Sequence, residues 1–119
     1  MNAKQLGEWG EAIALDFLLK KNYSFVAKCF RSRFGEIDLI VNNQEFIVFA
    51  EVKLRKNADF AQAREYIGKT KQNKIRATAG LWLSLKETLL QPRFDVIEIY
   101  APDGFNTKLP DIIHIENAF

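Results

Sequence analysis

The chain has 119 residues, of which 48% are hydrophobic and 13% aromatic, enough apolar material for the core of a single domain over residues 1–119. Charged residues of both signs make up 27% of the chain, which argues against disorder, and no apolar run reaches the roughly 18 residues that a membrane span needs. Cys29 and His114 are each alone in the sequence, which excludes an internal disulfide, a multi-thiolate zinc site and paired-histidine mechanisms. The amino-terminal segment resembles neither a signal peptide nor a transit peptide, so we expect a soluble cytoplasmic protein.

The first predicted element is a helix over about Lys4–Lys21, because apolar residues recur there at helical spacing. A strip of small residues on one side of this helix should let another backbone lie close. Glu11 projects from the edge of the strip beside Leu15, so we expect this acid to face the interior. The small residues of the strip are Gly7, Gly10 and Ala14.

Three strands are predicted after the helix. The first covers Tyr23–Phe30, where aromatic and β-branched residues alternate with polar ones. Strands over about Glu36–Val41 and Phe46–Leu54 flank the polar turn Asn42–Glu45, and the three segments together indicate an antiparallel hairpin. Both hairpin strands are largely apolar on their two faces, which is typical of central strands.

Helical spacing returns over about Lys69–Leu90, with Leu89 on the apolar face and Pro92 expected to end the helix. The preceding segment 57–68 fits a loop or a short helix equally well. A fourth strand is predicted over Arg93–Tyr100, followed by a turn at 102–104 and a possible short edge strand at Asp111–Ile115. The order α-β-β-β-α-β predicts the α/β class, with a mixed sheet that contains an antiparallel hairpin and is flanked by helices.

Charged side chains interrupt the apolar hairpin strands. Glu51 and Lys53 share one face of their strand, and Asp38 lies on the preceding strand. A turn of two or four residues would place Asp38 opposite either Phe49 or Glu51, and both registers bring the acids and the lysine together. Ionised groups at half-buried positions are costly unless they are paired or bind a metal.

Two chemical interpretations fit this constellation. In the first, Asp38 and Glu51 hold Mg²⁺ or Mn²⁺, Glu11 is a further ligand directly or through water, and Lys53 orients the attacking water. In the second, the same residues form a buried ion-pair network that only fixes the hairpin. We favour the metal site, because a purely structural ionic network gains little stability over apolar residues.

Basic residues are concentrated in the segments 20–33 and 53–76, whereas acids predominate after Arg93. This asymmetry suggests a polyanionic partner, although a solvated surface explains it equally well. Lys71 leans toward the sheet and would reach either the site or a phosphate, or would simply extend its ammonium group to solvent. Lys74 lies more to the side of this helix, where it suits contacts with the backbone phosphates of a nucleic acid. His114 is expected to be a structural or surface residue.

At the level of motifs, Glu36-Ile37-Asp38 followed by Glu51-Val52-Lys53 resembles the PD-(D/E)xK motif of restriction-endonuclease-like nucleases. Glu11 is similar to the first-helix acid of archaeal Holliday junction resolvases. The segments GEWGEAIALDFLLKKNY, GEIDLIV, FAEVKLR and RFDVIEIY resemble the YraN family of small bacterial proteins, as far as about Tyr100. Ile37 stands where the motif has proline, which removes no ligand.

The resemblance implies a restriction-endonuclease-like core and a metal-dependent nuclease that acts on DNA. Resolvase-like cleavage of branched DNA is one form of this activity. It assigns catalysis to Asp38, Glu51 and Lys53. Cutting both strands symmetrically would suit a homodimer, but the sequence shows no interface. The contacts to nucleic acid that we expect come from Arg31, Arg33, Arg55, Lys71 and Lys74.

Two other functions compete with nuclease activity. One is a module that keeps the fold and binds nucleic acid without turnover. The other is an adaptor whose basic face binds an acidic protein, which predicts weak DNA binding even at low salt.

Overall fold

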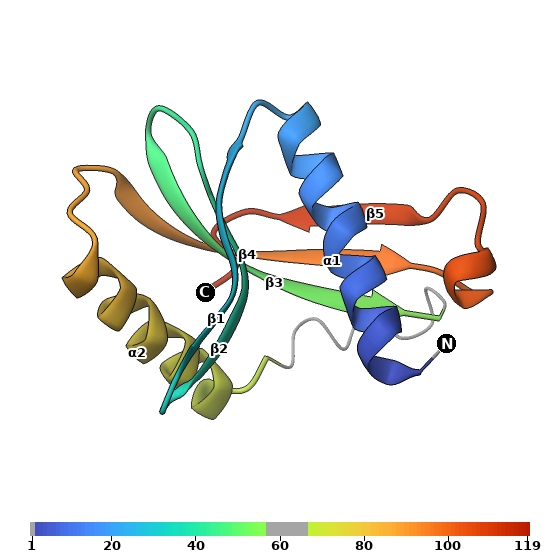
Figure 1. The fold of residues 1–119 in the computed structure, drawn as a ribbon, viewed down its shortest axis with the longest axis horizontal. Helices are drawn as coiled ribbons and strands as arrows, with labels where there is room; N and C mark the ends of the chain where they lie inside the picture. Colours follow the sequence, from blue (N-terminus) through green and yellow to red (C-terminus); the bar gives the residue numbers. More distant parts are fainter. Residues whose placement is uncertain (1, 57–66) are drawn as a thin grey trace.

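A computed structural model describes residues 2–56 and 67–119. Within these ranges the strands form one five-stranded sheet in the order β1-β2-β3-β4-β5, with α1 and α2 on its two faces (Figure 1). The undecided segment 57–68 falls almost wholly outside the described residues. No helix in the described part of the chain is long and apolar enough to cross a membrane.

The elements follow the predicted order, with the short edge strand at the end. The helices are α1 (Ala3–Lys20) and α2 (Lys69–Leu85), and a short 3-10 turn, η2, covers Gly104–Asn106. The strands are β1 (Ser24–Ser32), β2 (Gly35–Asn42), β3 (Phe46–Arg55), β4 (Gln91–Tyr100) and β5 (Asp111–Ile115).

The sheet is mixed, as predicted. β1, β2 and β3 are antiparallel neighbours, whereas β4 runs parallel to β3, so the chain crosses between them through α2. β5 pairs antiparallel with β4 at the edge of the sheet. A mixed sheet with a hairpin and helices on both faces is the architecture that the nuclease resemblance implied.

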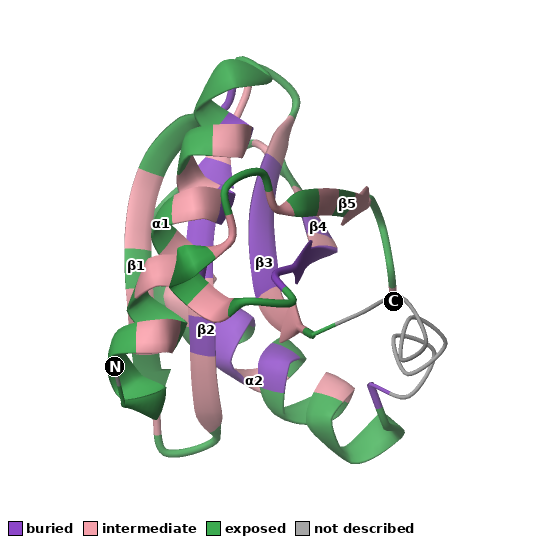
Figure 2. Cartoon of the chain, turned by 90° about the vertical axis from the view of Figure 1, so that its right-hand side faces the viewer, coloured by how far each residue is buried: buried purple, intermediate pink, exposed green. Residues whose placement is uncertain are grey.

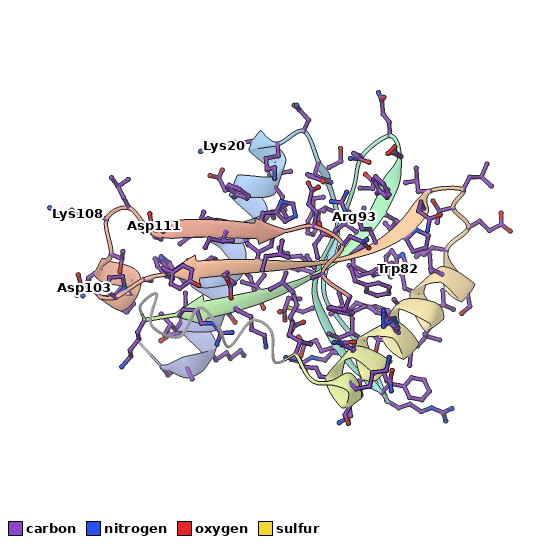
Figure 3. All side chains as sticks on the ribbon, turned by 180° about the vertical axis from the view of Figure 1, so that it is seen from behind. Lys20, Trp82, Arg93, Asp103, Lys108 and Asp111 are labelled. Carbon is purple, nitrogen blue, oxygen red and sulfur yellow. The ribbon has the colours of Figure 1, made fainter. Side chains whose placement is uncertain are left out.

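Two hydrophobic clusters hold the helices to the sheet, and the central strands are buried on both sides (Figure 2). On one face Ala14 and Leu18 of α1 pack with Leu39 and Ile97. On the other face Ile75 and Ala79 of α2 pack among residues of β2 and β3, with Trp82 at the border of the cluster (Figure 3). Burial on both faces explains why the strands read as nearly continuous apolar runs.

The small-residue strip of α1 is confirmed in part. Gly10 and Ala14 are buried, and a Cβ atom at position 10 would lie 3.7 Å from Leu54 Cδ1. The space around Gly7 is open, with nothing within 4 Å of such an atom. The close approach therefore involves only the middle of the helix.

The predicted end of the second helix is wrong. α2 ends at Leu85, Lys86 is already extended, and Leu89 is fully exposed rather than on the apolar face. Pro92 lies within β4 instead of ending the helix. The physical reason is that the chain must turn back to β3: the Leu90 N–H donates to Thr88 Oγ1, and the Gln91 N–H donates to the Glu45 carbonyl at 3.0 Å.

Candidate functional site

Asp38 lies where β2 and β3 separate. The regular pairing of the two strands extends to Leu39 opposite Ala50, and the same register places Asp38 opposite Glu51, which is one of the two predicted registers. At this point the Val52 N–H donates to Asp38 Oδ2 at 2.8 Å. The carboxylate thus takes the position of a strand partner, and this bond fixes its direction beside Glu51.

The Asp38 carboxyl group is in an unfavourable environment for a negative charge. Burial is the main cause that raises its pKa to about 7, and the charge of Glu51 raises it further, against the lowering effect of the Val52 hydrogen bond. Glu11 and Glu36 add smaller repulsions in the same direction. Near neutral pH the site therefore holds a carboxyl group that a cation would help to ionise.

Two lysines converge on Glu51 from different elements. Lys71 Nζ of α2 lies 2.7 Å from Glu51 Oε1, and Lys53 Nζ of β3 lies 3.5 Å from the same oxygen. Of the positions expected for Lys71, the structure shows the one in which its ammonium group contacts the site. Because its neighbours Ile75 and Ala79 pack on the sheet, the helix holds Lys71 above the strand.

The two ammonium groups differ in their electrostatics. Burial lowers the pKa of Lys53, and the neighbouring Lys71 lowers it further. Burial is the largest single influence on Lys71 and opposes its charge, but the hydrogen bond to Glu51, the contact with Lys53 and the charges of Glu51 and Asp38 together outweigh burial and raise the pKa of Lys71. Lys71 consequently forms the stronger ion pair with Glu51, and Lys53 is the amine that is more available to interact with another group.

Glu11 faces the interior from α1, as predicted, but its neighbour there is a thiol. Cys29 Sγ lies 3.5 Å from Glu11 Oε1, and burial is the main cause that raises the pKa of both groups, that of Cys29 to about 11. A cavity of about 250 Å³ beside them is lined by α1 and β1 residues that include Lys28. Glu11 acts on Asp38 through its charge rather than by contact in this arrangement.

The donor set fits one class of metal better than others. Across residues 2–56 and 67–119, no group of three or more His, Cys, Asp or Glu side chains could hold a metal ion. Asp38 and Glu51 form a pair of hard oxygen donors, and Mg²⁺ or Mn²⁺ commonly takes one or two carboxylates and completes its shell with water. The pair fits such an ion and does not fit a structural zinc site.

The predicted nucleic-acid residues fall into two groups. Arg31, Arg33 and Lys74 are exposed beside the turn between β1 and β2, with Arg31 Nε 3.4 Å from Glu36 Oε2. Arg55 is different, because its side chain is only 20% exposed and its Nε lies 3.9 Å from Glu98 Oε2 inside the sheet layer. Arg55 is thus positioned as a counter-charge to Glu98 rather than toward solvent.

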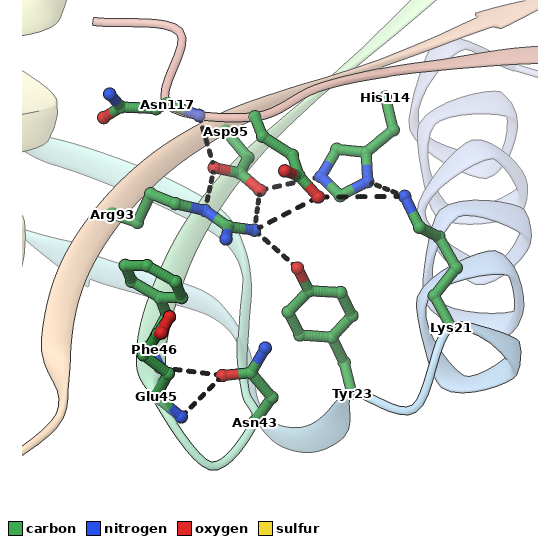
Figure 4. A network of polar contacts seen from close by, with 10 residues as sticks. Lys21, Tyr23, Asn43, Glu45, Phe46, Arg93, Asp95, His114 and Asn117 are labelled. Carbon is green, nitrogen blue, oxygen red and sulfur yellow. Dashed lines mark hydrogen bonds and ion pairs between the residues drawn. The ribbon is translucent and has the colours of Figure 1, made fainter.

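A second polar cluster, which the sequence did not predict, surrounds Asp95 of β4, a residue that pairs with Ala50 of β3 (Figure 4). We call it the Asp95 network, and its members are Lys21, Tyr23, Arg93, Asp95, His114, Glu116 and Asn117. Asp95 is fully buried and receives hydrogen bonds from Arg93 at 2.7 and 2.9 Å and from the Asn117 N–H at 3.0 Å. The Asn117 bond joins β4 to the segment after β5.

His114 extends the Asp95 network to α1. Its Nε2 lies 2.7 Å from Asp95 Oδ2, and its Nδ1 lies 2.7 Å from Lys21 Nζ. Because a carboxylate accepts and an ammonium donates, the imidazole donates through Nε2 and accepts through Nδ1. The expectation that His114 is structural is therefore supported by its position in this network. The spacing Arg93-x-Asp95, which puts both residues on one strand face, was the available sequence signal.

Comparisons with known proteins agree on one family. The model of the uncharacterised protein family UPF0102 matches residues 10–99. A UPF0102 protein of Geotalea daltonii is 42% identical over 117 residues, covering 98% of this chain and 90% of the relative. A UPF0102 protein of Caldicellulosiruptor bescii is 40% identical over 121 aligned residues and covers both chains completely.

Proposed function

This chain belongs to the UPF0102 family, and we propose that it is a metal-dependent nuclease that hydrolyses phosphodiester bonds in DNA. The observation that carries the proposal is the pair Asp38 and Glu51, two carboxyl groups kept close although burial and mutual repulsion raise the pKa of Asp38 to about 7. A site that disfavours its own charges in this way is a candidate for binding a divalent cation. Lys53 and Lys71 stand at the same place.

Asp38 and Glu51 are the residues that would hold Mg²⁺ or Mn²⁺. Such an ion, when bound, supplies a nucleophilic water at neutral pH and offsets the charge on the phosphate. The Val52 N–H holds Asp38 in place, since it donates to Oδ2 at 2.8 Å. Lys71 holds Glu51 in the same way through the 2.7 Å contact.

Lys53 is the residue that we expect to act on the reacting phosphate. Its ammonium group is 3.5 Å from Glu51 and half-buried, so its charge is weakly screened by solvent. Placed beside the phosphorus, it would stabilise the negative charge that develops as the water oxygen bonds to phosphorus and one ester P–O bond breaks. The leaving oxygen takes up a proton, and the products are a phosphate monoester end and a hydroxyl end.

The surface around the site suits a polyanion. Arg31, Arg33 and Lys69 are exposed, and Lys74 is exposed on α2 beside the same turn. Such residues position a duplex through its phosphates without reading its sequence. DNA is therefore the polymer that this arrangement favours over an uncharged substrate.

A second function is favoured by one specific contact. Lys71 already neutralises Glu51 at 2.7 Å, which is the arrangement expected if the cluster were a stable ion pair with no need for a metal. In that case the chain would be a nucleic-acid-binding module that keeps the architecture without turnover. DNA affinity and its salt dependence would then be nearly the same in Asp38→Asn and in the unmodified protein.

The test is cleavage of linear, nicked, flapped and four-way DNA with Mn²⁺ or Mg²⁺. We expect cleavage that stops on chelation and that is lost in Asp38→Asn, Glu51→Gln and Lys53→Met. Glu36→Gln is the matched control, because Glu36 lies near Asp38 but pairs with the exposed Arg31. Absence of cleavage of every substrate by the folded protein, with DNA affinity retained, would favour the binding module.

A further inference from the structure

The turn between β1 and β2 presents an aromatic ring to solvent. Phe34 is 41% exposed at this turn, although the protein buries other phenylalanines of the sheet such as Phe49. The guanidinium of Arg33 lies 4.9 Å from the centre of the Phe34 ring, and Arg31 is exposed on the same hairpin. An exposed aromatic ring beside arginines is the combination that proteins use to stack on bases of nucleic acids.

The turn is fixed to α2. Ser32 Oγ lies 2.8 Å from Thr78 Oγ1, and Thr78 is fully buried and donates in turn to the Lys74 carbonyl. The Phe34 N–H donates to Ser32 Oγ at 3.0 Å, which ties the aromatic residue to the same anchor. The ring is therefore carried by a defined turn, which lowers the entropy cost of using it in binding.

The same face of α2 connects this turn with the candidate site. Lys71 contacts Glu51, while Lys74, one turn further along, packs beside Gly35, where a Cβ atom would lie 3.5 Å from Lys74 Cβ. Along β2, Phe34 precedes Asp38 by four positions, so extended chain separates them by roughly 10 to 13 Å. Phosphates of one B-form strand are spaced by about 3.4 Å along the axis, so this span corresponds to about three or four nucleotides.

We propose that Phe34 stacks on an unpaired base and so directs the nuclease site to DNA in which a base is unpaired about three or four nucleotides from the cleaved bond. This inference rests on the proposed function, which it extends by naming the substrate class and the residue that selects it. A continuous duplex offers no free base face, so Phe34 would add nothing there. At a bulge, flap or branch the free base face is available, and the exposed arginines and lysines hold the adjoining phosphates.

Charge decides between DNA and a protein partner for this turn. Its exposed neighbours are basic on both elements, Arg31 and Arg33 on the hairpin and Lys74 on α2, with Glu36 as the nearby acid. Such a surface attracts the phosphates on either side of an unpaired base. If Phe34 instead bound a protein partner, the affinity for DNA would show no preference for unpaired bases.

The experiment compares binding to two DNA molecules in the presence of EDTA, so that affinity is measured without cleavage. One is a continuous duplex, and the other is the same duplex with an unpaired adenine at its centre. We expect Phe34→Ala to weaken binding to the bulged duplex by at least about fivefold, the lower end for loss of one base stack, and to leave affinity for the continuous duplex within about twofold. Phe34→Trp should retain the preference.

Phe25→Ala is the matched control, because Phe25 is the same residue type on β1 with a similar exposure of 47%, but at the opposite end of the strand. An equal loss in Phe25→Ala and Phe34→Ala would overturn the inference, as would equal affinity of the unmodified protein for both duplexes. Thermal unfolding of each variant verifies that the fold is kept.

Cleavage in Mn²⁺ then separates this inference from the proposed function. The unmodified protein should cut about three or four nucleotides from the bulge, and in Phe34→Ala the cut positions should become dispersed. This result would support both the nuclease activity and the role of Phe34. Metal-dependent cutting that is unaffected by Phe34→Ala, in rate and in position, overturns the role of Phe34 and leaves the nuclease. A bulge preference that depends on Phe34 in a protein that never cleaves supports the stacking role and contradicts the nuclease.

Discussion

Asp38 and Asp95 are both withdrawn from solvent on the same sheet, yet their environments have opposite effects. Burial alone would raise the pKa of Asp95, but hydrogen bonds from His114, Arg93 and Asn117 outweigh it and lower the pKa. Burial also acts on Asp38, and there the charge of Glu51 adds to it, so the pKa rises to about 7. The surrounding groups thus favour the charged form of Asp95 and disfavour the charged form of Asp38.

Under the proposed function, this contrast separates a structural charge, that of Asp95, from a functional one, that of Asp38. A fully hydrogen-bonded buried charge stabilises its surroundings once formed, and removal of one partner is costly. A carboxyl group held against like charge costs stability, and a site that keeps such a cost is expected to use it. The following substitutions test the two halves of the comparison, beginning with the largest expected effect.

Asp95→Ala should destabilise the protein by about 3 to 5 kcal/mol, because it leaves the buried Arg93 without its carboxylate partner. The measurement is the free energy of unfolding from urea titration. Asp16→Ala is the control, since Asp16 forms an exposed pair with Lys20 and should cost less than about 1 kcal/mol. A loss of the same small size in Asp95→Ala would contradict the structural role of the network.

Asp38→Asn should stabilise the protein by about 2 to 4 kcal/mol at pH 8 while cleavage is lost, because it removes a charge that the fold disfavours. Asparagine keeps an oxygen acceptor for the Val52 N–H. The pKa of Asp38 is higher in the folded than in the unfolded state, so wild-type stability falls as pH rises from about 4 to about 7 and then levels off.

The gain from Asp38→Asn should consequently be smallest below about pH 4 and largest above about pH 7. Unfolding midpoints of both proteins across this range measure it. Glu8→Gln, on the exposed part of α1, serves as the carboxylate-to-amide control. Destabilisation of Asp38→Asn at pH 8 would show that Asp38 belongs to a stabilising network instead.

The apparent affinity for Mn²⁺ should increase about tenfold per pH unit between about pH 5 and 7 and become constant above that, because the ion competes with the proton of Asp38. Calorimetric titrations at several pH values measure this dependence. In Asp38→Asn the affinity should be weak and nearly independent of pH. An affinity of the unmodified protein that does not change with pH would place the bound ion away from Asp38.

Lys71→Gln should lower the cleavage rate at saturating DNA by about tenfold, the effect typical of a residue that positions a catalytic ligand. Lys74→Gln, one helical turn away, is the matched control and should lower DNA affinity a few-fold and reduce its salt dependence by about one charge, without changing that rate. Single-turnover kinetics separate the two effects. The same binding defect in both variants, with rates unchanged, would make Lys71 a phosphate contact.

Local periodicity was sufficient to predict most of the fold. The strands before and after Asn43 and the first helix were placed to within about two residues, because each buries a regular pattern of side chains. The end of α2 was missed because Leu89 continues the helical spacing, while the pairing of β4 with β3 turns the chain away. That pairing is a long-range contact and leaves no trace in the local pattern.

The candidate site also contains some residues that the local pattern predicts and others that only long-range contacts bring together. Asp38, Glu51 and Lys53 lie on neighbouring strands of one hairpin, so alternation and turn length were enough to bring them together. The position of Lys71 does not follow from the sequence pattern, because its contact with Glu51 depends on how α2 crosses the sheet. The Asp95 network was missed for the same reason: its members come from the region after α1, from β4 and from β5 with the segment that follows it, and these three parts are far apart in sequence.

The most direct test of the central claim is anomalous diffraction from crystals soaked in Mn²⁺. We expect a manganese peak bound by both Asp38 and Glu51, with the Lys71 ammonium still beside Glu51. If no peak appears between these carboxylates at saturating Mn²⁺, and Lys53 and Lys71 remain the partners of Glu51, the claim that Asp38 and Glu51 form a metal site is contradicted.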